Sequence, residues 1–233
     1  MSQQQPSHVH RINSFRRTLG FAFSVILYFT WNATVTKSAE WSSIVLCAND
    51  LIKCLPVAAL GIATWCTTGS VRWIPAALIF SAFGDLAGEH REFLLQIAMF
   101  AIAHIAYSIH FLKRAAIDKT AIALLVALCI AVVMLGIFII SHIKNTTEMV
   151  ACGSYIVIIA LMAGSAIVCR SAYRVWNIIA ATLFIFSDSC IAINRFVEHI
   201  PHAGLLIMST YFAAQYIFAT VYLAEHNTQT ANK

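Results

Sequence analysis

The chain is built from long apolar runs, most of them about as long as the stretch with which a helix crosses a membrane. A transmembrane helix takes about 20 predominantly apolar residues. Such runs follow one another along almost the whole chain, at 18–32, 43–64, 73–89, 92–112, 121–141, 149–169, 175–196 and 203–224. The pattern predicts an all-α, polytopic integral membrane protein with eight transmembrane helices. In this prediction, residues 18–224 form a single transmembrane domain between cytoplasmic tails at 1–17 and 225–233.

The composition agrees with a chain whose main solvent is lipid. Charged residues make up 11% of the sequence, whereas soluble domains carry about 25%. The eight runs leave no room for a separate soluble domain. The first run lies close to the second and lacks a small-residue cleavage site, so we expect it to be a membrane span and not a removable signal peptide.

Lysine and arginine are distributed unevenly between the two sides that eight spans would create. Four lie on one side, at Lys37, Arg91, Lys144 and Arg195, and Lys53 lies inside a span. The other ten share the side of both termini: Arg11, Arg16, Arg17, Arg72, Lys113, Arg114, Lys119, Arg170, Arg174 and Lys233. Because positive loops stay in the cytoplasm, both termini are expected to be cytoplasmic. The net charge of +5 therefore reflects topology, and no nucleic-acid partner is expected. The membrane would be a bacterial inner membrane or, in a eukaryote, the endoplasmic reticulum.

Two aspartates interrupt the apolar runs. Asp85 and Asp188 each lie near the end of a predicted span. A carboxylate at that depth costs roughly 2.5–3.5 kcal/mol on insertion scales, so an acid there is a candidate functional group. Their obvious cationic partners in the sequence are Lys53 and Arg195.

Other polar residues recur at helical spacing and predict a shared polar face. Ser81, Asp85 and Glu89 follow one another at intervals of four, which places them on one side of a helix. Two further groups share helix faces in the same way, Phe100 with His104 and Tyr107, and Tyr211 with Gln215. In another run, Ser187 directly precedes Asp188. Because lipid does not solvate such groups, we expect these faces to meet around one polar cavity in the outer half of the bilayer. The runs 121–141 and 149–169 are nearly all apolar.

Each of these polar residues also has a purely structural explanation. Asp50 and Lys53, three residues apart, are spaced to form an ion pair that fixes helix packing. Glu89 suits a solvated helix end, and His104 suits a hydrogen-bonded packing position. Tyr211 and Gln215 are residues of the kind that join membrane helices to one another.

The polar motifs, taken in order, resemble those of the YhhN/TMEM86 family of eight-span membrane proteins, some of which are lysoplasmalogenases. The resemblance covers most of the chain, from the second run to the eighth. One departure is Gln96, where the family pattern suggests glycine, and Asn194 is a second position without a clear match. The matching segments are Lys53-Cys54-Leu55-Pro56, Ser81-x-x-Gly84-Asp85, Phe100-x-x-x-His104-x-x-Tyr107, Ser187-Asp188 and Tyr211-x-x-Ala214-Gln215.

The resemblance implies a hydrolase that cleaves the vinyl ether bond of choline or ethanolamine lysoplasmalogens. The products would be a fatty aldehyde and glycerophosphocholine or glycerophosphoethanolamine. Such hydrolysis passes through an oxocarbenium ion, and a pair of carboxyl groups in one desolvated site can divide the acid and base roles. We therefore expect Asp85 and Asp188 to be catalytic, with their roles unassigned, and no metal or cofactor. The residues expected to position the lysophospholipid or water are Lys53, Ser81, Glu89, His104, Tyr107, Ser187, Tyr211 and Gln215.

Other functions use intramembrane acids as well. A proton-coupled transporter would use Asp85, Asp188 and His104 as a relay, although the sequence lacks the repeats and broken helices that many transporters show. An intramembrane aspartyl protease would have a glycine where Ala82 stands. A zinc hydrolase of the ceramidase type needs several histidines in its spans. A lipid-binding protein without catalysis is consistent with the same cavity.

Overall fold

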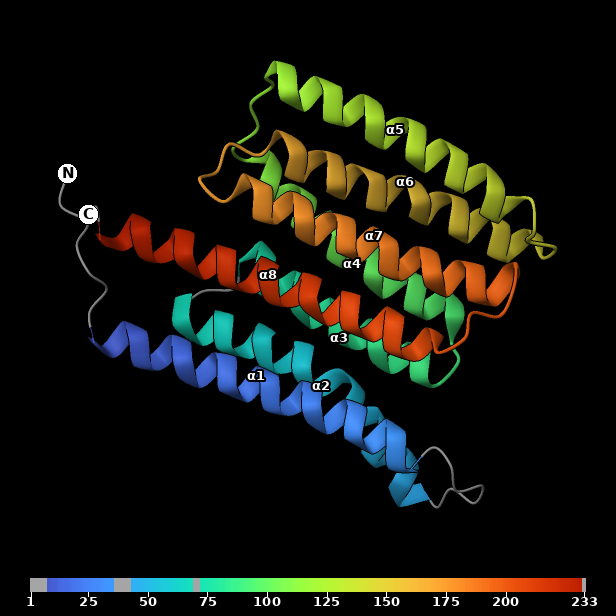
Figure 1. Ribbon diagram of the computed structural model, residues 1–233, viewed down its shortest axis with the longest axis horizontal. Helices are drawn as coiled ribbons and strands as arrows, with labels where there is room; N and C mark the ends of the chain where they lie inside the picture. The colour runs from blue at the N-terminus through green and yellow to red at the C-terminus, as the bar shows by residue number, and fades with distance from the viewer. Residues whose placement is uncertain (1–7, 36–42, 69–71, 232–233) are drawn as a thin grey trace.

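The computed structural model describes residues 8–35, 43–68 and 72–231 and shows an all-α protein. Its eight helices follow the predicted runs in order (Figure 1). They are α1 (His8–Val35), α2 (Ser43–Thr68), α3 (Trp73–Glu89), α4 (Phe93–Leu112), α5 (Lys119–Ile140), α6 (Thr146–Val168), α7 (Arg174–Phe196) and α8 (Ala203–Ala231). The predicted fold class is confirmed.

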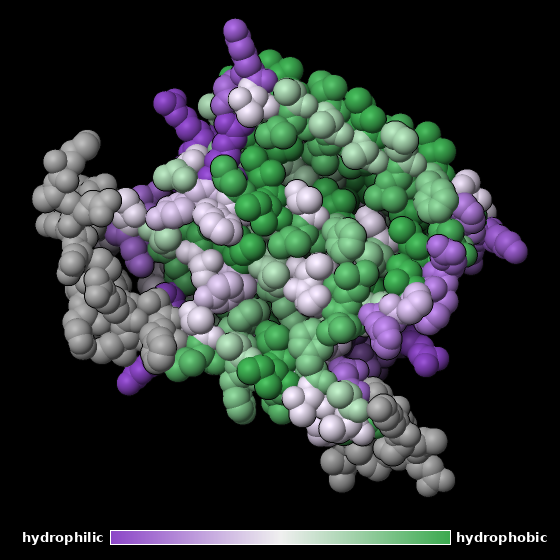
Figure 2. Space-filling model, viewed as in Figure 1, coloured by the Kyte–Doolittle hydropathy of each residue, from purple (hydrophilic) through white to green (hydrophobic). Residues whose placement is uncertain are grey.

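Seven of these helices are long and apolar enough to cross a membrane. The remaining helix, α3, has 17 residues and packs closely against both α2 and α4. Figure 2 shows hydrophobic residues over the middle of the visible face and hydrophilic residues gathered toward its two ends. This distribution is what a bilayer requires of the surface that faces lipid. The protein is a polytopic α-helical membrane protein.

The helices form a bundle in which α1 and α5 lie at opposite edges (Figure 1). Helix α1 packs mainly on α2, and α5 mainly on α6. Between them, α3 packs on α4 and α7 packs on α8, while α6 contacts α4 and α8 contacts α2 and α3. The inner helices therefore supply the surroundings of any group that lies in the middle of the bundle.

Both the start of α1 and the end of α8 lie at one end of the bundle, which we call the terminal end (Figure 1). Two connections meet there through an isolated β-bridge between Ala115 and Cys169. The amide of Arg170 donates to the carbonyl of Arg114 at 2.7 Å beside this bridge. An even number of helices explains why the start of α1 and the end of α8 lie on one side, as predicted. The assignment of that side to the cytoplasm stays a prediction.

The helices extend beyond the predicted domain limits. Helix α1 begins at His8, within the predicted tail 1–17, and α8 continues to Ala231, within the predicted tail 225–233. Residues 1–7 and 232–233, together with Lys37, lie outside the described residues.

Small residues let α3 and α4 approach closely. A Cβ atom on Gly84 would lie 2.8 Å from Cε2 of Phe100, and one on Gly88 would lie 2.6 Å from Nε2 of Gln96. Real Cβ atoms do not tolerate such distances, so each glycine makes room for one α4 side chain. Gln96, the departure from the family pattern, thus fits into space left by Gly88.

This close packing predicts that Gly84→Ala destabilises the protein. The new methyl group would push against the Phe100 ring, which is buried among other aromatic rings, and overpacking of this kind costs about 1–3 kcal/mol. Gly136→Ala is the control, because its Cβ would lie 3.7 Å from Ile156 and alanine favours a helix by roughly 0.5–1 kcal/mol. Thermal unfolding in detergent should show a lower Tm for Gly84→Ala alone. Equal Tm values for the two variants would contradict the close approach.

Candidate active site

Polar side chains from several helices meet inside the half of the bundle that lies away from the terminal end. We call the central five of them the acid cluster: Asp85, His104, Tyr155, Asp188 and Tyr211. Within it, each aspartate is hydrogen-bonded to a tyrosine from another helix. Both acids that the sequence analysis identified belong to it.

Asp85 of α3 is deeply buried, with 3% of its surface exposed. The hydroxyl of Tyr211, on α8, donates a hydrogen bond of 2.8 Å to its Oδ2 atom. Both Lys53 and Asp188 lie close enough to Asp85 to interact with it electrostatically. The tyrosine hydroxyl takes the place of a water molecule beside a group that is costly to bury.

Asp188 of α7 is only half-buried and belongs to a chain of hydrogen bonds. The hydroxyl of Tyr155, on α6, donates to Oδ2 of Asp188. The same hydroxyl lies 2.8 Å from Nε2 of His104, and this Nε2 atom lies 3.8 Å from Oδ2 of Asp188. Because the hydroxyl has one proton and donates it to Asp188, the ring of His104 must donate through Nε2.

In the neutral ring, this arrangement leaves Nδ1 of His104 as a hydrogen-bond acceptor. Among the described residues, neither this buried Nδ1 atom nor the buried Oγ atom of Ser81 has a partner. Buried polar atoms nearly always have a partner, so unpartnered ones in a cluster of acids indicate a place for a polar group of a ligand or for water.

Aromatic rings join the two halves of the acid cluster. The ring of Phe184 lies 4.6 Å from that of His104 and 5.4 Å from that of Tyr211, between centroids. Phe100 contacts Phe184 at 6.1 Å and Tyr211 at 5.8 Å. Phe184 is fully buried and Phe100 nearly so. These rings exclude water and so strengthen the electrostatic interactions of the carboxyl groups around them.

A second layer of charges lies one helical turn from Asp85. The Nζ atom of Lys53 is 3.0 Å from Oε2 of Glu89, and Asn49 also donates to Glu89. Asp50 instead pairs with His90, at 3.2 Å between Oδ2 and Nε2. The considered pairing of Asp50 with Lys53 is therefore wrong, because each residue faces a partner on or next to α3.

Two other predicted positioning residues pair with each other. The hydroxyl of Tyr107 donates to Oε1 of Gln215 at 2.5 Å, and both side chains are fully buried. Gln215 also lies against Tyr211. This pair therefore supports the acid cluster from the side of α4 and α8.

Two residues of the sequence prediction have partners elsewhere. Ser187 donates to the backbone carbonyl of Ile207 at 3.1 Å and thereby joins α7 to α8. Arg195, which the sequence suggested as a partner of Asp188, donates to Glu148 at 2.7 Å and lies 4.0 Å above the ring of Phe93.

Tyr155 is the member of the acid cluster that sequence reasoning missed. It lies in the run 149–169, which looked nearly all apolar, although it is the one tyrosine there. A tyrosine in the middle of a membrane span needs a partner for its hydroxyl, and this was the signal that would have identified it.

Two small cavities reach Asp188. Each has a volume of about 60 Å³ and mainly apolar walls, one between α4, α5, α6 and α7 and the other between α5, α6 and α7. The residues that line them include Tyr155 and Asp188, and Asp85 is not among them. Neither of these two cavities therefore reaches both aspartates, and one polar cavity shared by all these groups stays a prediction. A larger polar pocket lies at the terminal end.

Within the part of the chain that the structure describes, no group of three or more His, Cys, Asp or Glu side chains is placed to hold a metal ion. The described residues thus provide no centre of the kind that a zinc hydrolase uses.

Comparison with known proteins places this arrangement in a family. Residues 48–221 match the YhhN family. The chain is 32% identical to lysoplasmalogenase TMEM86A of Bos taurus over 218 residues, which cover 85% of both chains. It is 30% identical to lysoplasmalogenase TMEM86B of Rattus norvegicus, over 72% of this chain and 70% of the relative.

A bacterial relative is similar as well. The lysoplasmalogenase of Mycobacterium tuberculosis (strain CDC 1551 / Oshkosh) is 27% identical, over 62% of this chain and 58% of the relative. No solved structure matches. The acid cluster lies entirely within the matched residues, and the chain belongs to the YhhN family.

Proposed function

We propose that this protein is a membrane-embedded lysoplasmalogenase. It hydrolyses the vinyl ether bond of a choline or ethanolamine lysoplasmalogen to a fatty aldehyde and the corresponding glycerophospho-alcohol. The names of its relatives support this class of activity. The observation that carries the proposal is the position of Asp188, which joins Tyr155 and His104 to apolar cavities inside the membrane.

The first step of the reaction requires an acid, and water takes part only in the second step. A proton adds to the alkenyl carbon farther from oxygen, and the remaining carbon and oxygen share the positive charge of an oxocarbenium ion. Water adds to this carbon and loses a proton, which gives a hemiacetal. The hemiacetal then breaks its bond to the glycerol oxygen, which takes up a proton, and releases the aldehyde. A pair of carboxyl groups suits these opposite demands, as in glycoside hydrolysis.

Asp188 is the group placed to meet the substrate, because it lines both cavities. We assign it the transfer of the proton to carbon. Asp85 supplies the second carboxyl group of the pair. Once Asp188 has transferred its proton, the negative charge of the pair stabilises the oxocarbenium ion and accepts the proton of the attacking water. Nδ1 of His104, an acceptor without a partner, orients the water.

The neighbouring residues suit the two ends of a lysoplasmalogen. The ion pair of Lys53 and Glu89 lies one helical turn from Asp85 and matches a head group that carries both a phosphate and an ammonium group. An apolar groove of about 620 Å³ runs between α4, α5 and α6. Val132 lines both this groove and one cavity at Asp188, so the alkenyl chain can extend from the acid into the groove.

We expect Asp85→Asn and Asp188→Asn each to lower the release of aldehyde from a lysoplasmalogen by about 10²–10⁴-fold, the usual contribution of general acid–base catalysis. The measurement uses purified protein in detergent, where no membrane gradient exists. Turnover by the unchanged protein under these conditions separates an enzyme from a proton-coupled transporter. Full activity in both variants would refute the catalytic role of the pair.

Tyr155→Phe should lower kcat by about 10- to 100-fold, because it removes the hydrogen bond that orients the carboxyl group of Asp188, and each tenfold loss corresponds to about 1.4 kcal/mol. Tyr173→Phe is the matched control, since Tyr173 precedes α7 at the terminal end. Steady-state kinetics on both variants checks the expectation. An unchanged kcat for Tyr155→Phe would show that the contact with Asp188 serves packing alone.

The proposed bond cleavage also predicts where solvent oxygen goes. Water attacks the alkenyl carbon, so the glycerol product keeps its own oxygen. Hydrolysis in ¹⁸O-labelled water, followed by mass spectrometry, should show no ¹⁸O in the glycerophospho-alcohol. Label in that product would indicate attack at the glycerol carbon and a different mechanism.

A further inference from the structure

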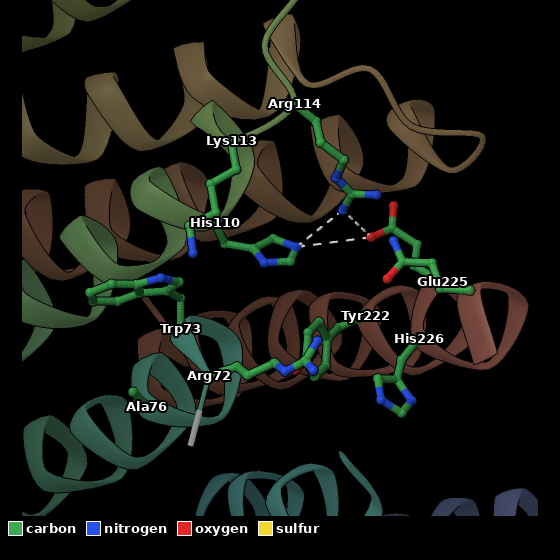
Figure 3. Close-up of a pocket in the computed structure, with 10 residues that line it drawn as sticks. Arg72, Trp73, Ala76, His110, Lys113, Arg114, Tyr222, Glu225 and His226 are labelled. Atoms are coloured by element: carbon green, nitrogen blue, oxygen red, sulfur yellow. Dashed lines mark hydrogen bonds and ion pairs between the residues drawn. The ribbon is translucent and has the colours of Figure 1, made fainter. Parts of the chain in front are cut away.

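The terminal end of the bundle contains a large pocket that the proposed reaction does not use. It has a volume of about 620 Å³, within the range of sites for small ligands. Its walls come from the start of α3, the end of α4 and the last turns of α8 (Figure 3). We call it the terminal pocket.

The terminal pocket carries a net positive charge. Arg72, Lys113 and Arg114 line it, and Glu225 is the one acid among its lining residues. Three cations and one carboxylate leave two positive charges when the histidines are neutral. His110 and His226, which also line the pocket, offer ring N–H groups as additional donors.

Glu225 holds part of this arrangement in place. Its carboxylate is buried and accepts hydrogen bonds from both Arg114 and Ser171. His110 lies beside the same pair, with Nε2 3.9 Å from Oε2 of Glu225 and 3.4 Å from Nη2 of Arg114. The guanidinium of Arg114 is therefore fixed before any ligand arrives, which lowers the entropic cost of binding.

The two other cationic side chains of the pocket, those of Arg72 and Lys113, are exposed. Lys113 lies over the ring of Trp73, with Nζ 5.4 Å from its centroid, and both residues are exposed. Figure 3 shows Arg72 extending toward Tyr222 on the other side of the pocket. His226 contributes a buried Nδ1 atom that has no partner among the described residues. Cationic side chains thus line the pocket from the two residues that follow α4 and from the residue that precedes α3.

The terminal pocket is separate from the acid cluster. Tyr222 follows Tyr211 by eleven residues of one helix, a rise of about 16 Å, and His110 follows His104 by six residues, about 9 Å. The glycerol backbone between the ether oxygen and the phosphate of a lysoplasmalogen is much shorter than the first distance. One substrate molecule therefore does not place its ether at Asp85 and its phosphate beside Tyr222.

We propose that the terminal pocket binds a phosphomonoester group. Such a group carries about −1.5 to −2 charges at neutral pH, which matches the two excess positive charges, and its oxygens suit the fork of an arginine. A zwitterionic phosphodiester would bring a second cation into a pocket that is already positive. The group belongs either to a lipid head group of the adjacent leaflet or to a soluble phosphate ester.

Two binding measurements on the full-length protein distinguish these sources. Thermal-shift titration in detergent uses glycerol phosphate as the soluble probe, with glycerol as the uncharged comparison. Native mass spectrometry from mixed micelles counts bound phosphatidic acid, with phosphatidylcholine as the comparison. Saturable binding of glycerol phosphate supports the proposal with a soluble source, and binding of phosphatidic acid alone supports it with a lipid source.

The double variant Arg72→Gln/Lys113→Gln should weaken this binding by about tenfold or more, as expected when charge-assisted hydrogen bonds are lost. Arg170→Gln/Lys119→Gln is the matched control: it removes the same charges at the same end of the bundle, from residues that do not line the pocket. Lys113→Gln alone, which changes one exposed side chain, gives the same direction if the double variant does not fold. The proposal is overturned if neither probe binds or if both double variants weaken binding equally.

Discussion

A carboxyl group inside a bilayer is tolerated when side chains replace the water that it has lost. Here that replacement comes from a second helix in each case. Asp85 of α3 receives the hydroxyl of Tyr211 from α8, and Asp188 of α7 receives that of Tyr155 from α6. The contacts that make the acids tolerable also fix how the inner helices pack. The proposed chemistry and the packing of the helices therefore depend on the same hydrogen bonds.

The sequence was sufficient to predict the helices and to predict which residues share a helix face. Membrane thickness fixes the length of a span, so the apolar runs predicted all eight helices, and the helical period predicted that His104 and Tyr107 share a buried face. It was harder to predict which residues pair across helices. Lys53 faces Glu89 and not Asp50, and Tyr155 joined the cluster from a helix that looked apolar. Such choices depend on how the helices are rotated against one another, which no local pattern specifies.

The two polar regions of the bundle differ in how their charges are balanced. In the acid cluster and the layer beside it, each carboxyl group has a named partner, and aromatic rings close the space between them. In the terminal pocket, the cations exceed the carboxylates and several of them are exposed. The first arrangement suits a site that must keep water scarce while a reactive cation exists. The arrangement in the terminal pocket suits the reversible binding of ions or head groups at the membrane surface.

Helix α8 belongs to both regions. It runs without interruption from Ala203 to Ala231 and carries Tyr211 and Gln215 at one site and Tyr222 and Glu225 at the other. A rotation of this rod about its own axis would misalign hydrogen bonds at both sites together. Replacement of α8 by the equivalent helix of a relative would thus change the proposed active site and the terminal pocket at once. Because one helix supplies both sites, the two ends of the protein cannot evolve independently of each other.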